Sequence, residues 1–311
     1  MIENTPLVTV GIPTYNRPKG LERILECILN QNYRNLEVIV SDNCSDDPKV
    51  LEILEKYKAF DNRVSYYVQE RNISIVPNFQ FLLDKAAGDF FMWSADDYYY
   101  DITFIEACAE GLIHNNEVVA CITDVKIVGL DSVARETKLK RSFMQKSIYG
   151  RSFFWTKSPE ECKYFFCGLY RSAAVKNITF PNIWGGDHMF LLEVITKGKF
   201  LYIPGKSNLY YFRGGSSGSI EKVRKAFGIK KRIVFFDWYF IRYCYYPFRF
   251  KHLNKIQRTG LFISNSLGLL LNEEGILFRI LIVKPIKGVL KKVSKIFIFR
   301  QVKRKKTKKV I

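Results

Sequence analysis

Short apolar runs alternate with longer amphipathic stretches along the first 114 residues. The apolar runs are rich in β-branched and aromatic residues, which is typical of buried strands, and they lie at 7–12, 36–41, 64–68 and 90–94. The stretches between them carry apolar side chains at helical spacing and predict helices at 19–30, 76–87 and 102–114, together with one that begins at Pro48. This alternation predicts βαβ units, and hence an α/β fold with a mostly parallel sheet flanked by helices.

The pattern becomes less regular after residue 117. Here the sequence predicts strands at 118–123, 165–171 and 208–212 and one helix at 187–196. A segment rich in glycine and serine follows at 214–219. This segment is either a linker to the last part of the chain or a lid that becomes ordered over a ligand.

The positive charge of the chain is concentrated in its last third. The formal net charge is +19, with 49 Lys and Arg against 30 Asp and Glu. Residues 222–311 hold 24 Lys and Arg and 3 Asp and Glu, a net charge of +21, which leaves −2 for the first 221 residues. We therefore predict a near-neutral domain over residues 1–220 and a basic region over 221–311, with disorder at 300–311.

The basic region has the composition of a segment that lies on a membrane surface. It has no run of 18 uncharged apolar residues, which disfavours a spanning helix. Apolar residues between 286 and 297 share one helical face and lysines share another, while 232–250 is dense in aromatic residues. We predict peripheral, monotopic attachment to an anionic membrane surface. Nucleic-acid binding is disfavoured, because phosphate contacts need no apolar helix face.

The cysteines and the N-terminus indicate the compartment. The seven cysteines are scattered without metal-ligand spacing, which disfavours a structural zinc site and favours a reduced compartment. A strand is predicted within a few residues of Met1, and no basic segment followed by an apolar one precedes it. We therefore expect the protein at the cytoplasmic face of the cell membrane.

Two adjacent aspartates, Asp96 and Asp97, follow the predicted strand at 90–94. The carboxyl ends of strands in an open α/β sheet form the edge where ligands bind. Two like charges this close are stabilised by a cation, and a divalent metal that carries phosphates is the obvious candidate. An Asp-Asp pair alone also fits a solvated turn. The chain after the first strand lacks the glycine fingerprint of a dinucleotide site and the Gly-Lys-Ser/Thr of a P-loop, which disfavours both classes.

Several motifs, taken in order, resemble glycosyltransferase family 2, whose members have the GT-A fold. The motifs are Ile-Pro-Thr-Tyr-Asn-Arg at 12–17, Val-Ser-Asp-Asn-Cys-Ser-Asp-Asp at 40–47, Arg-Asn at 71–72, Gly-Asp at 88–89, Ala-Asp-Asp at 95–97 and Gly-Gly-Asp-His at 185–188. The resemblance covers roughly residues 5–215. It implies an inverting transfer of a sugar from a nucleotide-sugar donor.

The resemblance assigns nucleotide binding to residues at the ligand edge: Pro13, Thr14, Tyr15, Arg17, Asp42, Arg71 and Asp96. It implies that Tyr15 and Asp42 contact the base and that Asp96 faces the ribose. It also implies that Asp97 binds Mn²⁺ or Mg²⁺ on the diphosphate, and that Asp187 is the general base. His188 and Arg213 are candidate contacts for the acceptor or the diphosphate.

Simpler structural roles stay open for the same residues. Tyr15 can be a half-buried loop aromatic, and Asp42 can cap a turn in its Asp/Asn/Ser-rich loop. Asp187 can be a helix N-cap. Arg71 can be a surface charge, and His188 a structural histidine.

Three departures from the family pattern refine the expected activity. The usual Asp-x-Asp is Ser-Ala-Asp-Asp at 94–97, Gly186 takes a position that is often acidic, and the Gln-x-x-Arg-Trp signature of processive synthases is absent. We therefore expect the addition of one sugar, from a UDP-sugar, to a lipid-linked or saccharide acceptor in surface polysaccharide synthesis. The alternatives are a nucleotidyltransferase and a non-catalytic, membrane-bound nucleotide-sugar-binding protein.

Overall fold

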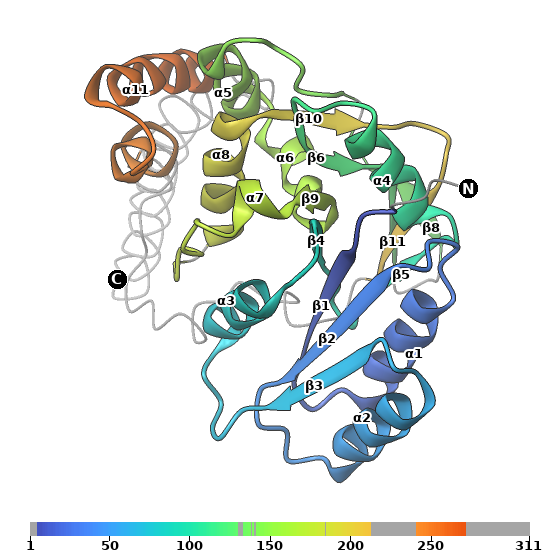
Figure 1. Cartoon of the computed structure of the whole chain (residues 1–311). Coiled ribbons are helices and arrows are strands. Elements are labelled where there is room, and N and C mark those ends of the chain that lie inside the picture. The colour runs from blue at the N-terminus through green and yellow to red at the C-terminus, as the bar shows by residue number, and fades with distance from the viewer. Residues whose placement is uncertain are drawn as a thin grey trace, which may run out of the picture.

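A mixed sheet of seven strands forms the centre of the computed structural model (Figure 1). The structure describes residues 5–129, 133–137, 139, 141–183, 185–212 and 241–271. The strand order is β10-β6-β9-β4-β1-β2-β3. The strands are β1 (Val8–Thr14), β2 (Leu36–Asp42), β3 (Val64–Val68), β4 (Phe90–Trp93), β6 (Val118–Ile122), β9 (Leu169–Arg171) and β10 (Lys199–Tyr202).

The predicted α/β sheet flanked by helices is confirmed. Neighbouring strands are parallel except at β9, which runs antiparallel to both β4 and β6. The register pairs Thr14 with Asp42 and Gly11 with Trp93, so β1, β2 and β4 end at one edge of the sheet. The loops that follow these three strands therefore lie close together.

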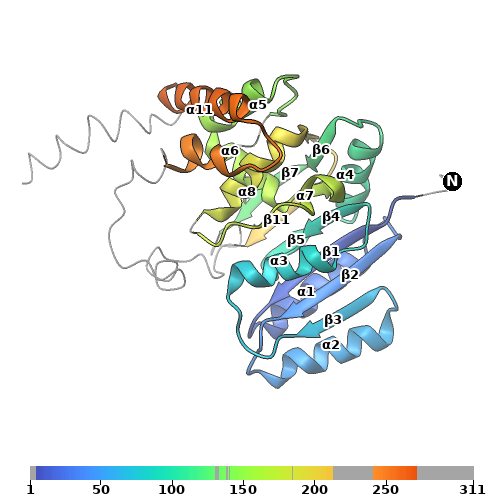
Figure 2. The ribbon, with the colours of Figure 1, turned by 60° about the vertical axis from the view of Figure 1, so that its left-hand side comes forward.

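Four helices connect the strands of the first half, and two of them begin with proline. They are α1 (Pro18–Leu29), α2 (Pro48–Phe60), α3 (Ile75–Lys85) and α4 (Phe104–Ile113). A proline in the first turn loses no hydrogen bond, because that N–H has no partner inside the helix. The helix α1 buries the apolar stripe that its spacing predicts, including Leu21, Ile24 and Ile28. One face of the parallel strands is covered by α3 and the other by α1 and α2 (Figures 1 and 2).

The second half is more irregular, as its sequence pattern indicates. Its helical elements are α5 (Ile148–Lys157), α6 (Pro159–Cys162), the 3₁₀ helix η1 (Lys163–Cys167), α7 (Ser172–Val175) and α8 (Gly186–Lys197). The strand predicted at 165–171 is wrong over residues 165–167, which belong to η1. Phe165 and Phe166 pack into aromatic clusters there, and a side chain at Gly168 would collide with the Cys121 carbonyl oxygen, 2.6 Å away.

A second sheet of four strands was not predicted as such. Its order is β5-β11-β7-β8, with β5 (Tyr98–Tyr100), β7 (Asp124–Val128), β8 (Ala134–Glu136) and β11 (Asn208–Phe212). The strand β5 begins directly after Asp97 and pairs antiparallel with β11. The loop that carries the two aspartates is thus held between the two sheets.

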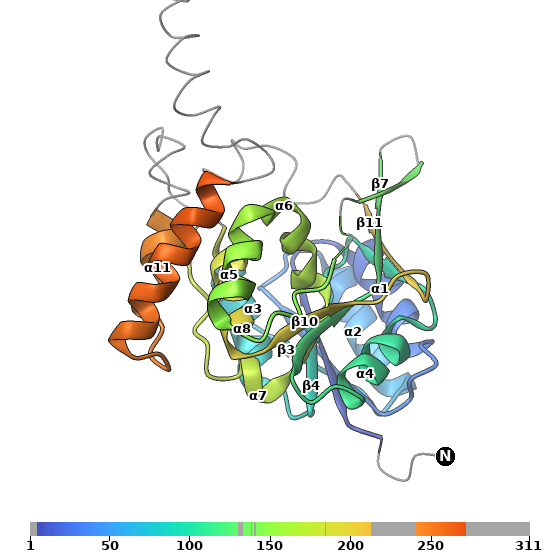
Figure 3. The same cartoon turned by 90° about the horizontal axis from the view of Figure 1, so that it is seen from above.

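Residues 241–271 pack against the second half of the domain. They form the π-helix η2 (Ile241–Tyr245), the 3₁₀ helix η3 (Tyr246–Arg249) and α11 (Lys255–Leu270). A capping box between Asn254 and Gln257 starts α11, which lies beside α5 (Figures 1 and 3). The boundary predicted near 220, the segment 214–219, the helix at 286–297 and the tail at 300–311 lie outside the described residues. Within the described ranges, no helix combines the length and apolar character needed to span a membrane.

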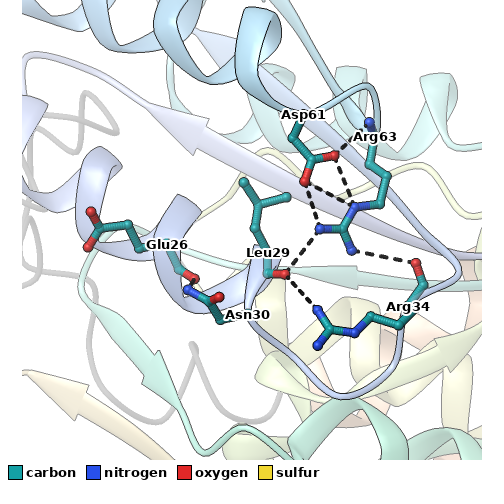
Figure 4. Close-up of polar contacts among 6 residues, drawn as sticks. All are labelled: Glu26, Leu29, Asn30, Arg34, Asp61 and Arg63. Carbon is teal, nitrogen blue, oxygen red and sulfur yellow. Dashed lines mark hydrogen bonds and ion pairs between the residues drawn. The ribbon is translucent and has the colours of Figure 1, made fainter.

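Two arginines cap the end of α1 that lies away from the ligand edge (Figure 4). Nη2 of Arg63 donates to the Leu29 carbonyl oxygen at 3.1 Å and pairs with Asp61 at 2.7 Å. Arg34 also reaches the Leu29 carbonyl, at 3.5 Å. The last carbonyls of a helix have no partner inside it, so these cations stabilise the end of α1. The Arg63 guanidinium lowers the pKa of the Asp61 carboxyl.

Candidate active site

A cleft of about 560 Å³ lies at the edge where β1, β2 and β4 end. Six of the residues predicted to bind the donor or its metal line it: Pro13, Thr14, Tyr15, Arg17, Asp96 and Asp97. The Thr14 hydroxyl is buried and has no hydrogen-bond partner among the residues that the structure describes. A buried polar atom of this kind usually has a partner, so its place in the wall of a cleft points to a ligand. A larger hollow of about 750 Å³ lies beyond Arg17 between α1 and α2, but it lacks the two aspartates.

Asn16 joins the loop after β1 to the loop after β2. Its backbone has a φ of 54°, in the left-handed region that asparagine tolerates better than most residues. Its side-chain Oδ1 accepts hydrogen bonds from the amides of Asp46 at 2.7 Å and Asp47 at 3.2 Å. Its own amide donates to Ser45 Oγ at 2.7 Å. These bonds fix the loop that carries Tyr15 into the cleft.

The end of β2 is held by its own polar side chains. Asp42 is buried, and its carboxylate accepts from the Ser45 amide at 3.1 Å and from the Ser45 hydroxyl at 2.5 Å. Asp42 therefore acts as a turn cap, and the cleft wall itself is formed by the next residue, Asn43. Asn43 accepts a hydrogen bond from the Ile73 amide at 2.8 Å and donates to the Ser74 carbonyl at 3.3 Å. It thereby positions the loop that precedes α3.

Two of the loop residues around the cleft share an uncommon backbone. Cys44 has a φ of 64° and Ser74 a φ of 73°, and both are non-glycine residues with positive φ, like Asn16. Such conformations cost about 1–3 kcal/mol each and persist where surrounding contacts enforce them. All three occur after strands that end at the ligand edge. This clustering at one edge of the sheet supports a functional role for it.

An aromatic cluster fixes the strand that leads into the aspartates. Trp93, the last residue of β4, stacks on Phe166 with ring centroids 5.2 Å apart and packs edge-on against Phe91 and Phe190. Its Nε1 donates to the Phe79 carbonyl at 3.0 Å. The end of β4 is therefore densely packed, which gives the aspartate pair that follows it a well-defined position.

Asp96 and Asp97 are both buried, at 6% and 8% exposure. Nη1 of Arg17 pairs with Asp96 Oδ1 at 2.7 Å, and Nη2 of Arg23 donates to the Asp96 carbonyl at 2.8 Å. Burial raises the pKa of the Asp96 carboxyl to about 6, which the Arg17 charge partly opposes and the neighbouring Asp97 reinforces. Burial likewise raises the pKa of Asp97. A side chain at Gly20 would collide with the Asp96 carbonyl, 2.8 Å away, so this glycine lets α1 approach the pair.

Asp187 lies in the first turn of α8, as predicted, but does not line the cleft of the aspartate pair. Asn182, five residues earlier, does line it. Burial, together with the nearby charges of Asp97 and Asp187, raises the pKa of the Cys167 thiol to about 12. Asp97 and Asp187 therefore both lie near enough to the buried Cys167 thiol for their charges to act on it.

Two glycines set the start of α8. Gly185, the residue before the helix, has a φ of 72°. A side chain at Gly186 would lie 2.1 Å from the Pro181 carbonyl oxygen, so this position has no room for one. An acidic side chain, which the family resemblance leads one to expect at this position, therefore does not fit here.

His188 contacts the C-terminal segment. Its Nδ1 lies 2.8 Å from the hydroxyl of Tyr243, which is fully buried in η2. A bridge between α8 and η2 is the structural role that the sequence left open for this histidine. Arg71 is exposed and does not line the cleft, although the next residue, Asn72, does. Arg213 falls outside the described residues.

The comparisons with known proteins decide the family. The model of the family described as "Glycosyl transferase family 2" matches residues 9–179, more than half of the chain. The chain belongs to glycosyltransferase family 2. This membership agrees with the resemblance carried by the motifs at 12–17, 40–47 and 95–97.

Curated relatives of this family 2 chain include two named glycosyltransferases. One, from Campylobacter jejuni, is the GalNAc(5)-diNAcBac-PP-undecaprenol beta-1,3-glucosyltransferase, 28% identical over 210 residues, or 66% of this chain and 64% of that protein. The other, from Methanococcus voltae, is a dolichyl N-acetyl-alpha-D-glucosaminyl phosphate 3-beta-D-2,3-diacetamido-2,3-dideoxy-beta-D-glucuronosyltransferase. It is 27% identical over 275 residues, or 82% of this chain and 83% of that protein. The match to the first relative thus spans less than two thirds of its length.

The solved structures confirm the GT-A-like fold of this family 2 chain. The crystal structure of S. aureus TarS 1–349 in complex with UDP-GlcNAc superposes with a TM-score of 0.60 at 18% identity. The superposition covers 84% of this chain and 71% of the TarS chain. At this identity the similarity is one of fold.

Proposed function

We propose that the protein is an inverting glycosyltransferase that moves one sugar from a nucleotide-sugar donor, a UDP-sugar, to a lipid-linked glycan in surface polysaccharide synthesis. One observation carries the proposal. In a family 2 chain, the loops after β1 and β2 and the buried Asp96–Asp97 pair line one cleft, and Asp187 lies in the first turn of α8, near enough to Asp97 for both charges to act on the Cys167 thiol. A donor in this cleft would have its nucleotide against the loops and its sugar toward α8.

The walls of the cleft have the chemistry to bind a nucleotide. Tyr15, 42% exposed, offers an aromatic face on which a base can stack. The buried Thr14 hydroxyl, which has no partner among the described residues, offers a polar contact in the same wall. Arg17 supplies a positive charge at the mouth, where a diphosphate would need one. Arg71 stays a prediction, because it lies outside the cleft wall.

The residues of the cleft fit a divalent metal bound mainly through the donor. No group of three or more metal-ligating side chains occurs in the part of the chain that the structure describes. Mg²⁺ and Mn²⁺ are commonly held by one or two carboxylates plus substrate phosphates, so two aspartates suffice. Asp96 is engaged by Arg17, which leaves Asp97 as the main ligand. When bound, the ion would neutralise charge on the departing nucleoside diphosphate.

Asp187 would act as the general base. Its carboxylate would take the proton from an acceptor hydroxyl as that oxygen attacks the anomeric carbon from the face opposite the leaving group. The bond from the anomeric carbon to the diphosphate breaks in the same displacement, which inverts the configuration. Gly185 has a φ of 72° and Gly186 has no room for a side chain, so the backbone at the start of α8, which carries Asp187, has a defined position.

The names of the relatives support a lipid-linked acceptor. The Campylobacter jejuni relative is named for an acceptor on undecaprenol diphosphate. A polyprenyl-linked acceptor cannot leave the bilayer, so the enzyme must come to the membrane. We therefore place the protein peripherally at the cytoplasmic membrane face, where nucleotide-sugar donors are available.

Substitution of the two carboxylates tests the proposal. Asp187→Asn and Asp97→Ala should each lower turnover of a UDP-sugar by at least about a hundredfold, given the usual size of acid–base and electrostatic contributions. The matched control is Glu106→Gln, which removes a carboxylate from the first turn of α4 and should leave turnover unchanged. Near-normal transfer by Asp187→Asn would remove this residue as the base. Product configuration, read by NMR, should be inverted.

A further inference from the structure

The helix α11 is apolar on two opposite faces. Its inner face buries Leu261, Gly268 and Leu269 against α5 and its neighbours. Its outer face carries an exposed stripe formed by Ile256, Ile263, Leu267, Leu270 and the following Leu271. These side chains are 80%, 54%, 49%, 62% and 60% exposed, in that order. At 100° per residue all five fall within about 100° of arc, so they share one side of the helix.

The stripe extends onto the segment before α11. Tyr245 and Phe248 are 51% and 40% exposed, and both rings pack on Phe262 of α11. Figure 3 shows α11 at the edge of the molecule, with α5 on its inner side. A helix that is apolar all round is normally buried, and contiguous exposed apolar surface marks an interaction site. Something must therefore cover this stripe when the protein works.

The charges around the stripe select the partner. Residues 241–271 contain five Lys and Arg and no Asp or Glu. Arg249, Lys251 and Lys255 are all exposed and lie next to the end of the stripe that Ile256 and Phe248 form. The sequence that follows, 272–311, adds 13 Lys and Arg against 2 Asp and Glu. An apolar face bordered by cations matches a bilayer with anionic headgroups.

A second copy of the chain fits this face less well. Two identical stripes would bring the same cations together. One helix of 16 residues is about 24 Å long and about 10 Å wide, so a single face offers far less than the roughly 800 Å² per partner of a stable interface.

We propose that the outer stripe of α11 is the surface by which the protein docks on an anionic lipid membrane. This inference rests on the proposed function, because a lipid-linked acceptor requires the enzyme at the bilayer. In the docked state α11 lies in the plane of the membrane, with its isoleucines and leucines at the level of the acyl chains and its lysines at the headgroups. The inner face of the same helix keeps its packing on α5.

Co-sedimentation of the full chain with vesicles of phosphatidylglycerol and phosphatidylcholine tests the docking surface. The wild type should bind these vesicles and bind pure phosphatidylcholine vesicles more weakly. The double variant Ile263→Gln, Leu267→Gln should bind at least about tenfold more weakly, because two apolar side chains lose their transfer into lipid. Glutamine is a good helix former, so α11 is retained. The matched control is Phe60→Gln, which removes an 82% exposed aromatic side chain at the end of α2 and should bind like the wild type.

Three results would overturn the proposal. Undiminished vesicle binding by the double variant would place the docking surface elsewhere. A wild-type dimer in sedimentation velocity that the double variant loses would assign the stripe to a second copy. A lower thermal midpoint of the double variant without vesicles would show that the chain's own tail covers the stripe. Hydrolysis of a UDP-sugar distinguishes a failure of the docking surface from a failure of the proposed function. The double variant should keep this hydrolysis. If the wild type bound vesicles but hydrolysed no UDP-sugar, the proposed function alone would be rejected.

Discussion

The burial of the Asp96 carboxylate should lower the free energy of unfolding of the protein at neutral pH. In the unfolded chain this carboxyl has its ordinary pKa of 3.8, whereas burial in the folded protein raises the pKa to about 6. The folded state therefore holds the proton more tightly. The free energy of unfolding falls as the pH rises through the window from about 4 to about 6, and the loss is complete above it.

The difference between the two pKa values gives the size of the effect. It corresponds to about 3 kcal/mol of lost stability at pH 8 and about 1 kcal/mol at pH 4.5. Asp96→Asn replaces the carboxylate with a neutral group of the same shape that can still accept the Arg17 hydrogen bond. The variant should therefore be more stable than the wild type by up to about 3 kcal/mol at pH 8, with a gain that shrinks on acidification. Its turnover should fall, because a proposed donor contact is lost.

Urea denaturation at pH 4.5 and pH 8 measures both values, provided that the slope with denaturant is the same in the two proteins. Asp61→Asn is a matched control of opposite sign. The Arg63 guanidinium lowers the pKa of Asp61, so the Asp61 charge stabilises the folded state above the ordinary pKa and loses this effect as the pH falls. Asp61→Asn should therefore be less stable than the wild type at pH 8.

Either of two results would contradict a destabilising burial of the Asp96 charge. Asp96→Asn could be less stable than the wild type at pH 8, which would mean that the ion pair with Arg17 outweighs the burial of the charge. The change in stability could also be the same at both pH values. In that case the Asp96 carboxyl would not titrate in the expected window.

Substitutions at three further positions test how the site is held. Asn16→Ala should lower the free energy of unfolding, measured by urea denaturation, by about 2 kcal/mol, because it removes the loop hydrogen bonds and leaves alanine at a positive φ. Asn16→Gly should lower it less, because glycine adopts that φ without strain. Gly186→Ala should displace the start of α8, because its new Cβ would lie 2.1 Å from the Pro181 carbonyl, and an unchanged thermal midpoint would contradict this packing. Tyr243→Phe should lower the free energy of unfolding by about 1 kcal/mol, because the hydrogen bond to His188 is lost, and it should leave the donor affinity unchanged. Weaker donor binding by calorimetry would instead show that this hydrogen bond belongs to the donor site.

The first half of the fold could be predicted from the sequence because its elements are regular. The helix at 19–30 and the strand at 64–68 have strong periodicity and clear boundaries, and the structure contains both as Pro18–Leu29 and Val64–Val68. The end of a strand is also where side chains meet, so the aspartate pair could be selected for the ligand edge by position, while Thr14 and Tyr15 are assigned to it through the family resemblance.

Other features depend on contacts that are distant in the sequence. Strand β5 has three residues and is stable only because β11, more than 100 residues later, pairs with it. Asn43 bears a side chain that any turn could contain, and its role appears only when the loop before α3 lies against it. The absence of space at Gly186 comes from a closer contact, the Pro181 carbonyl five residues earlier, but it depends on how the chain folds back there rather than on residue type. Such contacts cannot be predicted from residue type and spacing.

The three residues with positive φ, Asn16, Cys44 and Ser74, have a thermodynamic consequence for donor binding. Their loops are already held by hydrogen bonds in the free protein, so binding has little backbone left to order. The heat-capacity change of donor binding should then match the contact surface alone, without the extra negative contribution of a folding loop. Association should also be a single kinetic phase, because no slow loop closure has to follow the encounter on this side of the cleft.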